Sequence, residues 1–381
     1  MKLLTFIGTR PEAIKMAPVL HALRPRRDVT SLLALTGQHR ELIDAPLEFF
    51  GVPADYRLDL GDRDQDPLAF VERTVPELVR LLEIVRPDRV VVQGDTASAM
   101  AGAEAARQCA LPLAHVEAGL RTHCELPWPE EPFRRAIDAM SDLLLAPTDL
   151  AAANLRNEGL PGAIHITGNS GVDALHWVVD RLARNQALRR RCEAMVPTDR
   201  PFILVTLHRR ENIGQGTEAL CAALQEIARA LEIVLPLHPN PRFAEPIRRA
   251  LANRDGIHLL APQSPPAMVM LMQRSRLIMT DSGGIQEEAP SLGKPALVLR
   301  DATERPEGIA TGIATLVPLE TDAIVAAVRT EPGRAKDWPI ASNPYGDGRA
   351  ASRIAAALLG EPFSPFGTGA HSQVATPALR V

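Results

Sequence analysis

The chain has few of the features that mark disulfide-stapled, zinc-binding or nucleic-acid-binding proteins. Only four of its 381 residues are cysteines, none in CxxC spacing: Cys109, Cys124, Cys192 and Cys221. This scatter argues against a disulfide framework or a zinc site and suits a reducing compartment. The net charge is −4, and no run of lysine or arginine is long enough to follow a phosphate backbone. The sequence therefore gives no support for a nucleic-acid partner.

Long hydrophobic runs and several common catalytic motifs are also missing. The apolar start, residues 1–7, is too short for a secretory signal or a membrane span, so we expect a soluble cytoplasmic protein without a membrane partner. HExxH, GxSxG and GxGxxG do not occur, and the acidic clusters lack the spacing of metal-binding loops. These absences disfavour hydride transfer and serine hydrolysis, and we expect neither a metal ion nor a cofactor.

Short apolar runs alternate regularly with longer helical patterns. This order is typical of parallel sheets with helices on both faces, so the predicted fold class is α/β. Single cores rarely grow past about 250–300 residues, which favours two domains in a chain of 381 residues. The predicted strands of the first domain are residues 3–7, 31–35, 89–92, 113–115, 143–146 and 164–167. Those of the second are residues 202–206, 233–237, 256–260, 276–280 and 296–299.

These strands place the domains at residues 1–170 and 171–345, each a doubly wound, Rossmann-like sheet. Ligands bind such sheets at the carboxyl ends of the strands, so two facing sheets would form one cleft between the domains. The last segment, residues 361–381, is rich in Pro, Gly, Ser and Thr, and we expect it to be disordered.

The most informative stretch is residues 280–288, TDSGGIQEE, where an apolar run breaks into small residues and restarts as a helix. Ser282, Gly283 and Gly284 open the first helical turn, whose unpaired N–H groups and positive dipole end favour a phosphate. Glu287 and Glu288, one turn later, can accept hydrogen bonds from ribose hydroxyls. This pattern predicts a nucleotide ligand. The alternative is a Gly-rich turn capped by the serine.

Two loops of the first domain carry further candidates. Arg10 and Lys15 follow the first strand, with Pro11 at the start of a helix, and two cations there suit a diphosphate. The alternative is a capped surface helix with solvated charges. Asp95 ends the strand at residues 89–92 beside a glycine and is either a catalytic carboxylate or a helix N-cap.

The next loops add two more carboxylates. His115 and Glu117 stand at the end of the strand at residues 113–115, and the alternative to a catalytic role for Glu117 is an ion pair with Arg121. Glu131 follows in an acidic, Pro-rich helix start, where the alternative is simple stabilisation of the helix dipole.

In the second domain, one further strand end is basic. His208, Arg209 and Arg210 follow the strand at residues 202–206, and we expect them to neutralise phosphate, unless they form a salt-bridged surface loop. His238 is a weaker candidate, because a single histidine at a strand end is more often structural.

Taken together, these loops closely resemble the bacterial non-hydrolysing UDP-N-acetylglucosamine 2-epimerases. The resemblance is collinear from residue 2 to about residue 359. It is carried by residues 8–18 (GTRPEAIKMAP), 36–41 (TGQHRE), 94–96 (GDT), 115–121 (HVEAGLR), 127–131 (PWPEE), 208–212 (HRREN), 281–295 (DSGGIQEEAPSLGKP), 303–307 (TERPE) and 343–348 (NPYGDG).

The resemblance implies a glycosyltransferase-B-like fold whose first domain is completed by a C-terminal helix at about residues 346–360. It also implies reversible conversion of UDP-N-acetylglucosamine to UDP-N-acetylmannosamine without nicotinamide, a homodimer, and a role in cell-surface polysaccharide biosynthesis. The nucleotide-binding positions are matched by Arg10, His208, Ser282, Gly283, Gly284 and Glu288. The sugar-side catalytic positions are matched by Lys15, Asp95, Glu117, Glu131 and Arg134.

A second subsite is implied by Gln38, His39 and Arg40, which match the positions where bacterial members bind UDP-N-acetylglucosamine as an activator. Three residues depart from the family pattern. Leu207 replaces a glycine before the histidine, Phe133 replaces an asparagine before the arginine, and Met268 replaces an aromatic that packs on uracil.

Several alternatives stay open at this stage. They are an epimerase of a 2,3-diacetamido uronic acid nucleotide, a hydrolysing epimerase, a retaining glycosyltransferase and a non-catalytic nucleotide-sugar sensor. The individual roles of the three carboxylates also stay open. For the main hypothesis, loss of UDP should come first, because it builds positive charge at C1 and acidifies the C2 proton, giving 2-acetamidoglucal as the intermediate.

Overall fold

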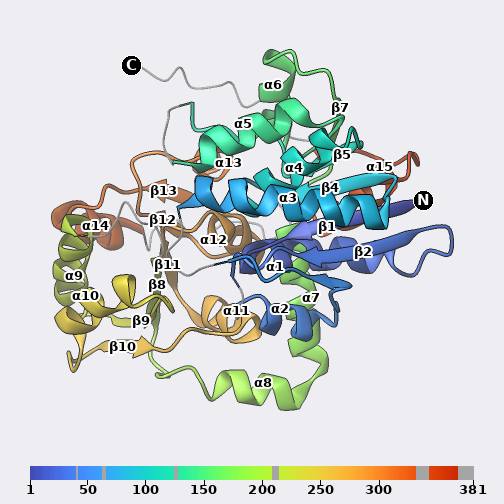
Figure 1. Cartoon of the computed structure of the whole chain (residues 1–381). Helices are drawn as coiled ribbons and strands as arrows, with labels where there is room; N and C mark the ends of the chain where they lie inside the picture. Colours follow the sequence, from blue (N-terminus) through green and yellow to red (C-terminus); the bar gives the residue numbers. More distant parts are fainter. Residues whose placement is uncertain (40–41, 62–65, 124–127, 208–213, 332–342, 368–381) are drawn as a thin grey trace. The chain divides into compact units, whose positions relative to one another are not determined.

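The computed structural model describes residues 1–39, 42–61, 66–123, 128–207, 214–331 and 343–367 (Figure 1). The chain forms two compact units. Unit 1 consists of Met1–Ala174 and Tyr345–Val381, and unit 2 consists of Leu175–Pro344. The division falls inside helix α7 (Ser170–Arg184).

Unit 1 is built on a seven-stranded, fully parallel sheet with the strand order β3-β2-β1-β4-β5-β6-β7. All six strands predicted for this region are present. β3, which was not predicted, is a two-residue strand at the sheet edge. The strands are β1 (Lys2–Ile7), β2 (Thr30–Leu35), β3 (Tyr56–Arg57), β4 (Arg89–Gln93), β5 (Leu113–Val116), β6 (Leu143–Ala146) and β7 (Ala163–Ile166).

Helices cover both faces of this sheet, as expected for a doubly wound domain. On one face, the buried Leu4, Phe6, Val90 and Val92 pack in a core with α3 and α4, which lie side by side in Figure 1. On the other, α1 packs against α2 and α15. The helices are α1 (Arg10–Leu23), α2 (Asp44–Phe50), α3 (Pro67–Val85), α4 (Ala97–Gln108), α5 (Glu130–Met140), α6 (Asp149–Asn157), α7, and α15 (Ala350–Leu358).

The chain beyond α15 departs from the expectation of a disordered tail. Residues 361–367 are placed against unit 1: the amide of Phe366 donates to the carbonyl of Ile166 at 3.0 Å, and Glu361 pairs with Arg26. The Phe363 ring also contacts His165. Two phenylalanines and an ion pair therefore anchor a segment whose composition alone suggested disorder. Residues 368–381 lie outside the described residues.

Unit 2 contains a six-stranded parallel sheet with the order β10-β9-β8-β11-β12-β13. The five predicted strands are present, and the short edge strand β13 was not predicted. The strands are β8 (Phe202–Thr206), β9 (Glu232–Pro236), β10 (Ile257–Leu260), β11 (Leu277–Thr280), β12 (Ala296–Val298) and β13 (Ala314–Leu316). The helical elements are α8 (Gln186–Glu193), α9 (Gln215–Ile227), α10 (Pro241–Leu251), α11 (Pro265–Arg274), α12 (Gly283–Glu288), η2 (Ala289–Leu292), α13 (Pro306–Ala310) and α14 (Thr321–Thr330).

Local sequence explains why the helices begin where the candidate residues lie. Thr9 and Thr96 cap α1 and α4 by accepting hydrogen bonds from backbone N–H groups of the first turn, and Pro11 occupies the first turn of α1. Because each cap directly follows a buried parallel strand, the capping loops meet at the carboxyl edge of the sheet. The described candidate residues of these two loops, Arg10 and Asp95, are therefore gathered at that edge.

Candidate active site

In unit 1, Lys15 and Glu117 form a nearly buried ion pair. The ammonium of Lys15 donates to Oε2 of Glu117 at 2.5 Å, and their side chains are only 10% and 9% exposed. The same oxygen accepts from Gln93 Nε2 at 3.1 Å and from Asn169 Nδ2 at 3.4 Å. Glu117 has a φ of 72°, which is uncommon for a residue with a side chain and marks a strained turn after β5. Donors from three other segments of unit 1 thus converge on the carboxylate of Glu117.

Arg134 joins the other two candidate carboxylates. Its Nε donates to Asp95 Oδ2 at 3.0 Å, and its Nη1 donates to Glu131 Oε2 at 2.6 Å. The amide of Thr122 also donates to that Glu131 oxygen at 3.1 Å. Asp95 is the most accessible of the three carboxylates, with 27% of its side chain exposed against 5% for Glu131.

These contacts bear on three of the alternatives that the sequence left open, and they resolve those for Glu117 and Asp95. The alternative for Glu117, an ion pair with Arg121, is wrong. Arg121 pairs with Asp138 and Glu158 instead. Thr96, one residue beyond Asp95, is the residue that caps α4. Glu131 does lie in the first turn of α5, but it also holds Arg134.

Two residues of the expected second subsite are described. Gln38 Oε1 accepts from the amide of Ser98 at 3.1 Å and from its hydroxyl at 2.7 Å, so Gln38 reaches the first turn of α4 near Asp95. The amide of His39 donates to the carbonyl of Gly8 at 2.8 Å. Arg40 lies outside the described residues.

Glu12 is a central residue of unit 1 that the sequence analysis did not single out. It is 1% exposed, and its carboxylate accepts from the amides of Gly8 (3.1 Å) and Thr9 (2.7 Å) and from the Thr96 hydroxyl (2.9 Å). Burial raises its pKa to about 7, although these hydrogen bonds act in the opposite direction. The capping-box spacing Thr9-x-x-Glu12 was the sequence signal that could have identified it. Glu12 ties the loop that carries Arg10 to the loop that carries Asp95.

Phe133, one of the departures from the family pattern, points into the core. It is 5% exposed and packs with Phe70 and Ala97. Where the family commonly has an asparagine, this chain therefore has an apolar contact between α5 and the first turn of α4.

In unit 2, the Gly-rich segment forms the predicted strand–turn–helix. Ser282 is the N-cap of α12, and its side chain makes no capping hydrogen bond in the described structure, so the purely capping interpretation is wrong for its hydroxyl. A Cβ on Gly283 would lie 2.5 Å from Nη1 of Arg305, whereas the nearest atom to a Cβ on Gly284 is 3.9 Å away. Gly283 therefore makes room for Arg305, whereas a Cβ on Gly284 would make only this one ordinary contact, with Oγ of Ser282, among the described residues.

The two glutamates of α12 have different surroundings. Glu287 is 1% exposed, and its Oε1 accepts from Nε of Arg305 at 2.5 Å, so it holds the neighbouring loop. Glu288 is partly exposed. Only Glu288 is accessible enough to reach a ribose. His208, Arg209 and Arg210 lie outside the described residues, and Leu207 and Met268 are partly buried.

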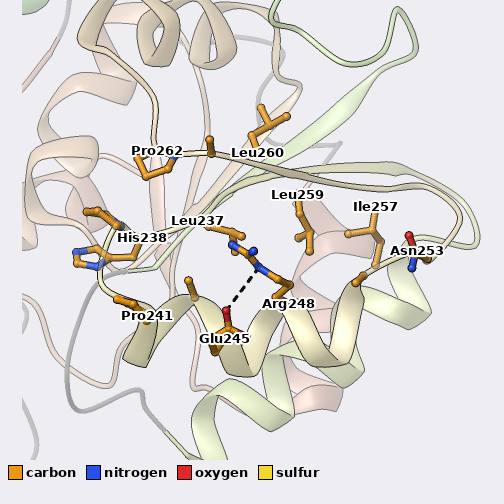
Figure 2. Close-up of a pocket in the computed structure, with 14 residues that line it drawn as sticks. Leu237, His238, Pro241, Glu245, Arg248, Asn253, Ile257, Leu259, Leu260 and Pro262 are labelled. Atoms are coloured by element: carbon orange, nitrogen blue, oxygen red, sulfur yellow. Dashed lines mark ion pairs between the residues drawn. The ribbon is translucent and has the colours of Figure 1, made fainter.

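His238 lines a cavity of about 620 Å³ between α10 and the end of β10 (Figure 2). Its Nδ1 accepts from the amide of Asn240 at 3.1 Å, which supports a structural role. Figure 2 also shows the ion pair of Glu245 and Arg248 in this cavity. In the sheet, β9 and β8 separate β10 from β11, so this cavity is distinct from the Gly-rich turn.

Two further kinds of feature are absent from the described ranges. No group of three or more His, Cys, Asp or Glu side chains there could hold a metal ion. No described helix is long and apolar enough to cross a membrane.

Comparisons with known proteins agree with these features. Residues 21–359 match the family model described as UDP-N-acetylglucosamine 2-epimerase. The chain is 44% identical to the UDP-N-acetylglucosamine 2-epimerase of Yersinia pestis over 94% of this chain and 98% of that one. Among solved structures, the UDP-GlcNAc 2-epimerase of Neisseria meningitidis bound to UDP-GlcNAc has a TM-score of 0.90 and 40% identity, covering 95% of this chain and 100% of that one.

A more distant relative has the same architecture. The UDP-GlcNAc 2-epimerase of Methanocaldococcus jannaschii, solved with UDP-GlcNAc and UDP, has a TM-score of 0.86 and 32% identity over 94% of this chain and 99% of that one. The predicted α/β class with two parallel-sheet, glycosyltransferase-B-like domains is confirmed. From the matched family model and these full-length similarities, the chain belongs to the UDP-N-acetylglucosamine 2-epimerase family.

Proposed function

We propose that this protein interconverts UDP-N-acetylglucosamine and UDP-N-acetylmannosamine by eliminating UDP and adding it back. The family membership supports the substrate, and relatives have been solved with UDP-GlcNAc or UDP. The observation that carries the proposal is the set of three carboxylates and two cations at one sheet edge of unit 1. These are Lys15, Asp95, Glu117, Glu131 and Arg134.

The chemistry of C2 explains why such a set is needed. No carbonyl lies next to C2 to acidify its proton, so direct deprotonation has a high barrier. When the C1–O bond breaks, its electron pair leaves with UDP, positive charge builds at C1, and the C2 proton becomes acidic enough for a carboxylate to remove. A C1–C2 double bond forms, giving 2-acetamidoglucal. Returning a proton to the opposite face of C2, with UDP adding back at C1, completes the inversion.

Proton transfer on two faces requires either two acid–base groups or one group with a reoriented intermediate. Asp95, Glu117 and Glu131 are the carboxylates we assign to this work. The contacts from Lys15 and Arg134 fix their orientation, which reduces the reorganisation needed in the transition state. The accessible position of Asp95 suits contact with the sugar.

We assign the nucleotide to Arg10, His208, Ser282, Gly283, Gly284 and Glu288. Arg10 begins α1, where it would offset diphosphate charge, and the lack of a side chain on Gly284 would allow a phosphate oxygen to approach the backbone. The partly exposed Glu288 would accept hydrogen bonds from the ribose. His208 is assigned from its sequence match alone.

A second UDP-N-acetylglucosamine is proposed to bind at Gln38, His39 and Arg40 and to activate the enzyme. The support is the contact of Gln38 with Ser98, three residues after Asp95, through which a ligand could affect the catalytic loop. Rates that rise sigmoidally with substrate would agree with this, and hyperbolic rates in both reaction directions would contradict it. We further propose that the enzyme acts as a cytoplasmic homodimer in cell-surface polysaccharide biosynthesis.

One NMR experiment tests the reaction. Purified protein incubated with UDP-N-acetylglucosamine should produce UDP-N-acetylmannosamine and reach the same mixture from either epimer. Release of N-acetylmannosamine with stoichiometric UDP would identify a hydrolysing enzyme instead. Product formation only after a sugar acceptor is added would identify a glycosyltransferase. Turnover of a 2,3-diacetamido uronic acid nucleotide alone would show that the enzyme is an epimerase of that UDP-sugar instead.

A further inference from the structure

Besides the contacts of the candidate carboxylates, unit 1 contains another buried network of charged side chains. His115, at the end of β5, and Asp138, on α5, are both 0% exposed, and Nδ1 of His115 lies 2.7 Å from Oδ1 of Asp138. The other ring nitrogen, Nε2, lies 2.8 Å from the carbonyl oxygen of Gly94. Oδ2 of Asp138 accepts from the amide of Gly119 at 3.2 Å and lies 2.7 Å from Nη1 of Arg121.

The hydrogen-bond partners determine the protonation of the histidine. The Gly94 carbonyl can only accept, so Nε2 must carry a proton. The cationic Arg121, whose Nη1 lies 2.7 Å from Oδ2 of Asp138, and the amide of Gly119 both stabilise the ionised form of Asp138. An ionised Asp138 also only accepts, so Nδ1 must carry a proton too. Both requirements together make His115 an imidazolium.

The network joins the segments that carry all three candidate carboxylates. The Gly94 carbonyl, fixed by His115, belongs to the residue directly before Asp95. The Gly119 amide, fixed by Asp138, lies two residues after Glu117, in a turn where Gly119 has a φ of 85°. On α5, Glu131 and Arg134 precede Asp138 by seven and four residues, a spacing that puts all three on one helix face. The strained turn at Glu117 can therefore be stabilised by the buried pair of His115 and Asp138.

We propose that His115, held as an imidazolium by Asp138, is a positioning residue that sets the geometry of Asp95 and Glu117 for proton transfer at C2. The inference rests on the proposed function for its reaction, but the protonation of His115 can be measured separately. His115 touches backbone and Asp138 rather than substrate, so its loss should affect the rate of the chemical step more than nucleotide affinity.

Two substitutions separate the hydrogen bonds made by the two ring nitrogens of His115. The amide nitrogen of His115→Gln can take the place of Nε2 and still donate to the Gly94 carbonyl, whereas that of His115→Asn can take the place of Nδ1 and still donate to Asp138. Both remove the positive charge. We expect kcat to fall at least about tenfold further in His115→Asn than in His115→Gln, because sub-ångström displacement of a reacting group has effects of this size. UDP affinity, measured by calorimetry, should change less than about threefold in both.

His21→Asn is the matched control. His21 also bonds a backbone carbonyl, that of Phe50 at 2.7 Å, but it lies in the last turn of α1, away from the carboxyl edge of the sheet. Its kcat should match that of the unsubstituted protein. If all three histidine variants lose kcat equally, or if both His115 variants keep it, the positioning role is overturned.

The protonation state is read from 15N NMR of the whole protein labelled at its histidines, with the His115 signals identified by their loss in His115→Gln. Two protonated ring nitrogens under the conditions of the activity assay support the inference, and one unprotonated nitrogen overturns it. Protein that lacks epimerase activity but shows the doubly protonated ring would contradict the proposed function and support the imidazolium. Active protein in which His115 is neutral would support the proposed function and overturn the inference about His115.

Discussion

Lys15 and Glu117 are 102 positions apart in the chain, and their side chains meet at 2.5 Å. The pair connects α1 with the turn after β5, and both side chains are largely shielded from water. A carboxylate held in this way keeps a fixed orientation at the cost of taking two charges out of water, so the two residues should behave as a unit.

Lys15→Met should lower kcat by about 100-fold, because Glu117 loses the cation that orients it, while the methionine keeps most of the apolar stem. Glu117→Gln should have an effect of similar size, and the double variant should lose little more than either single variant. Steady-state kinetics of the four proteins provide this test. Lys2→Met is a matched control, since the ammonium of Lys2 also donates a hydrogen bond, to the carbonyl of Val85, but Lys2 lies at the amino end of β1. Fully additive losses would show that Lys15 and Glu117 act separately.

The two glycines that begin α12 should respond differently to alanine. Gly283→Ala places a methyl group against the Arg305 guanidinium, whose pairing with Glu287 must then shift, and we expect a loss of about 1–3 kcal/mol in unfolding free energy. The methyl group of Gly284→Ala comes no closer than 3.9 Å to any described atom and should leave stability unchanged or slightly higher, but it should hinder a phosphate and weaken UDP binding. Denaturant unfolding and calorimetry measure the two effects. Unchanged UDP affinity in Gly284→Ala would argue against a phosphate at this turn.

Glu12 predicts a specific dependence of stability on pH. Its pKa is about 7 in the folded protein against an ordinary value of 4.5, so the folded state binds the proton more tightly than the unfolded chain. The stabilisation from this proton is fully present below 4.5 and is lost as the pH rises through 7, a change of about 3 kcal/mol.

The measurement compares the unfolding free energy of Glu12→Gln with that of the unsubstituted protein across this range. The glutamine side chain in Glu12→Gln is not ionisable and can still accept from the Gly8 and Thr9 amides, so the difference between the proteins isolates the titration. Relative to Glu12→Gln, the unsubstituted protein should become less stable with rising pH. A pH-independent difference, or one of opposite sign, would contradict a raised pKa for Glu12.

The sequence predicted the architecture because the strands of a doubly wound sheet are continuous apolar runs. All eleven predicted strands are present, and the two that were missed, β3 and β13, are edge strands of only two and three residues. The loops at strand ends were likewise identified from residue type. The tail was misjudged at residues 361–367, where Phe363 and Phe366 find partners that composition does not reveal.

Side-chain pairing within the site was much less predictable. Arg134 meets Asp95 across 39 positions, and His115 meets Asp138 across 23, so both pairs depend on tertiary structure. The sequence instead suggested Arg121 as a partner of Glu117 because the two are close in the chain. Glu12 was passed over for a similar reason, since its third hydrogen bond comes from Thr96, 84 positions away.

In the proposed reaction, C2 loses its proton while UDP is detached from the sugar. Turnover of UDP-N-acetylglucosamine in D2O tests it most directly, because the proton returned to C2 then comes from a side chain that exchanges with solvent. UDP-N-acetylmannosamine formed in D2O should carry deuterium at C2, and long incubation should release small amounts of UDP and 2-acetamidoglucal. Full retention of the C2 hydrogen, with no glycal under any condition, would contradict the mechanism even if the two epimers were interconverted.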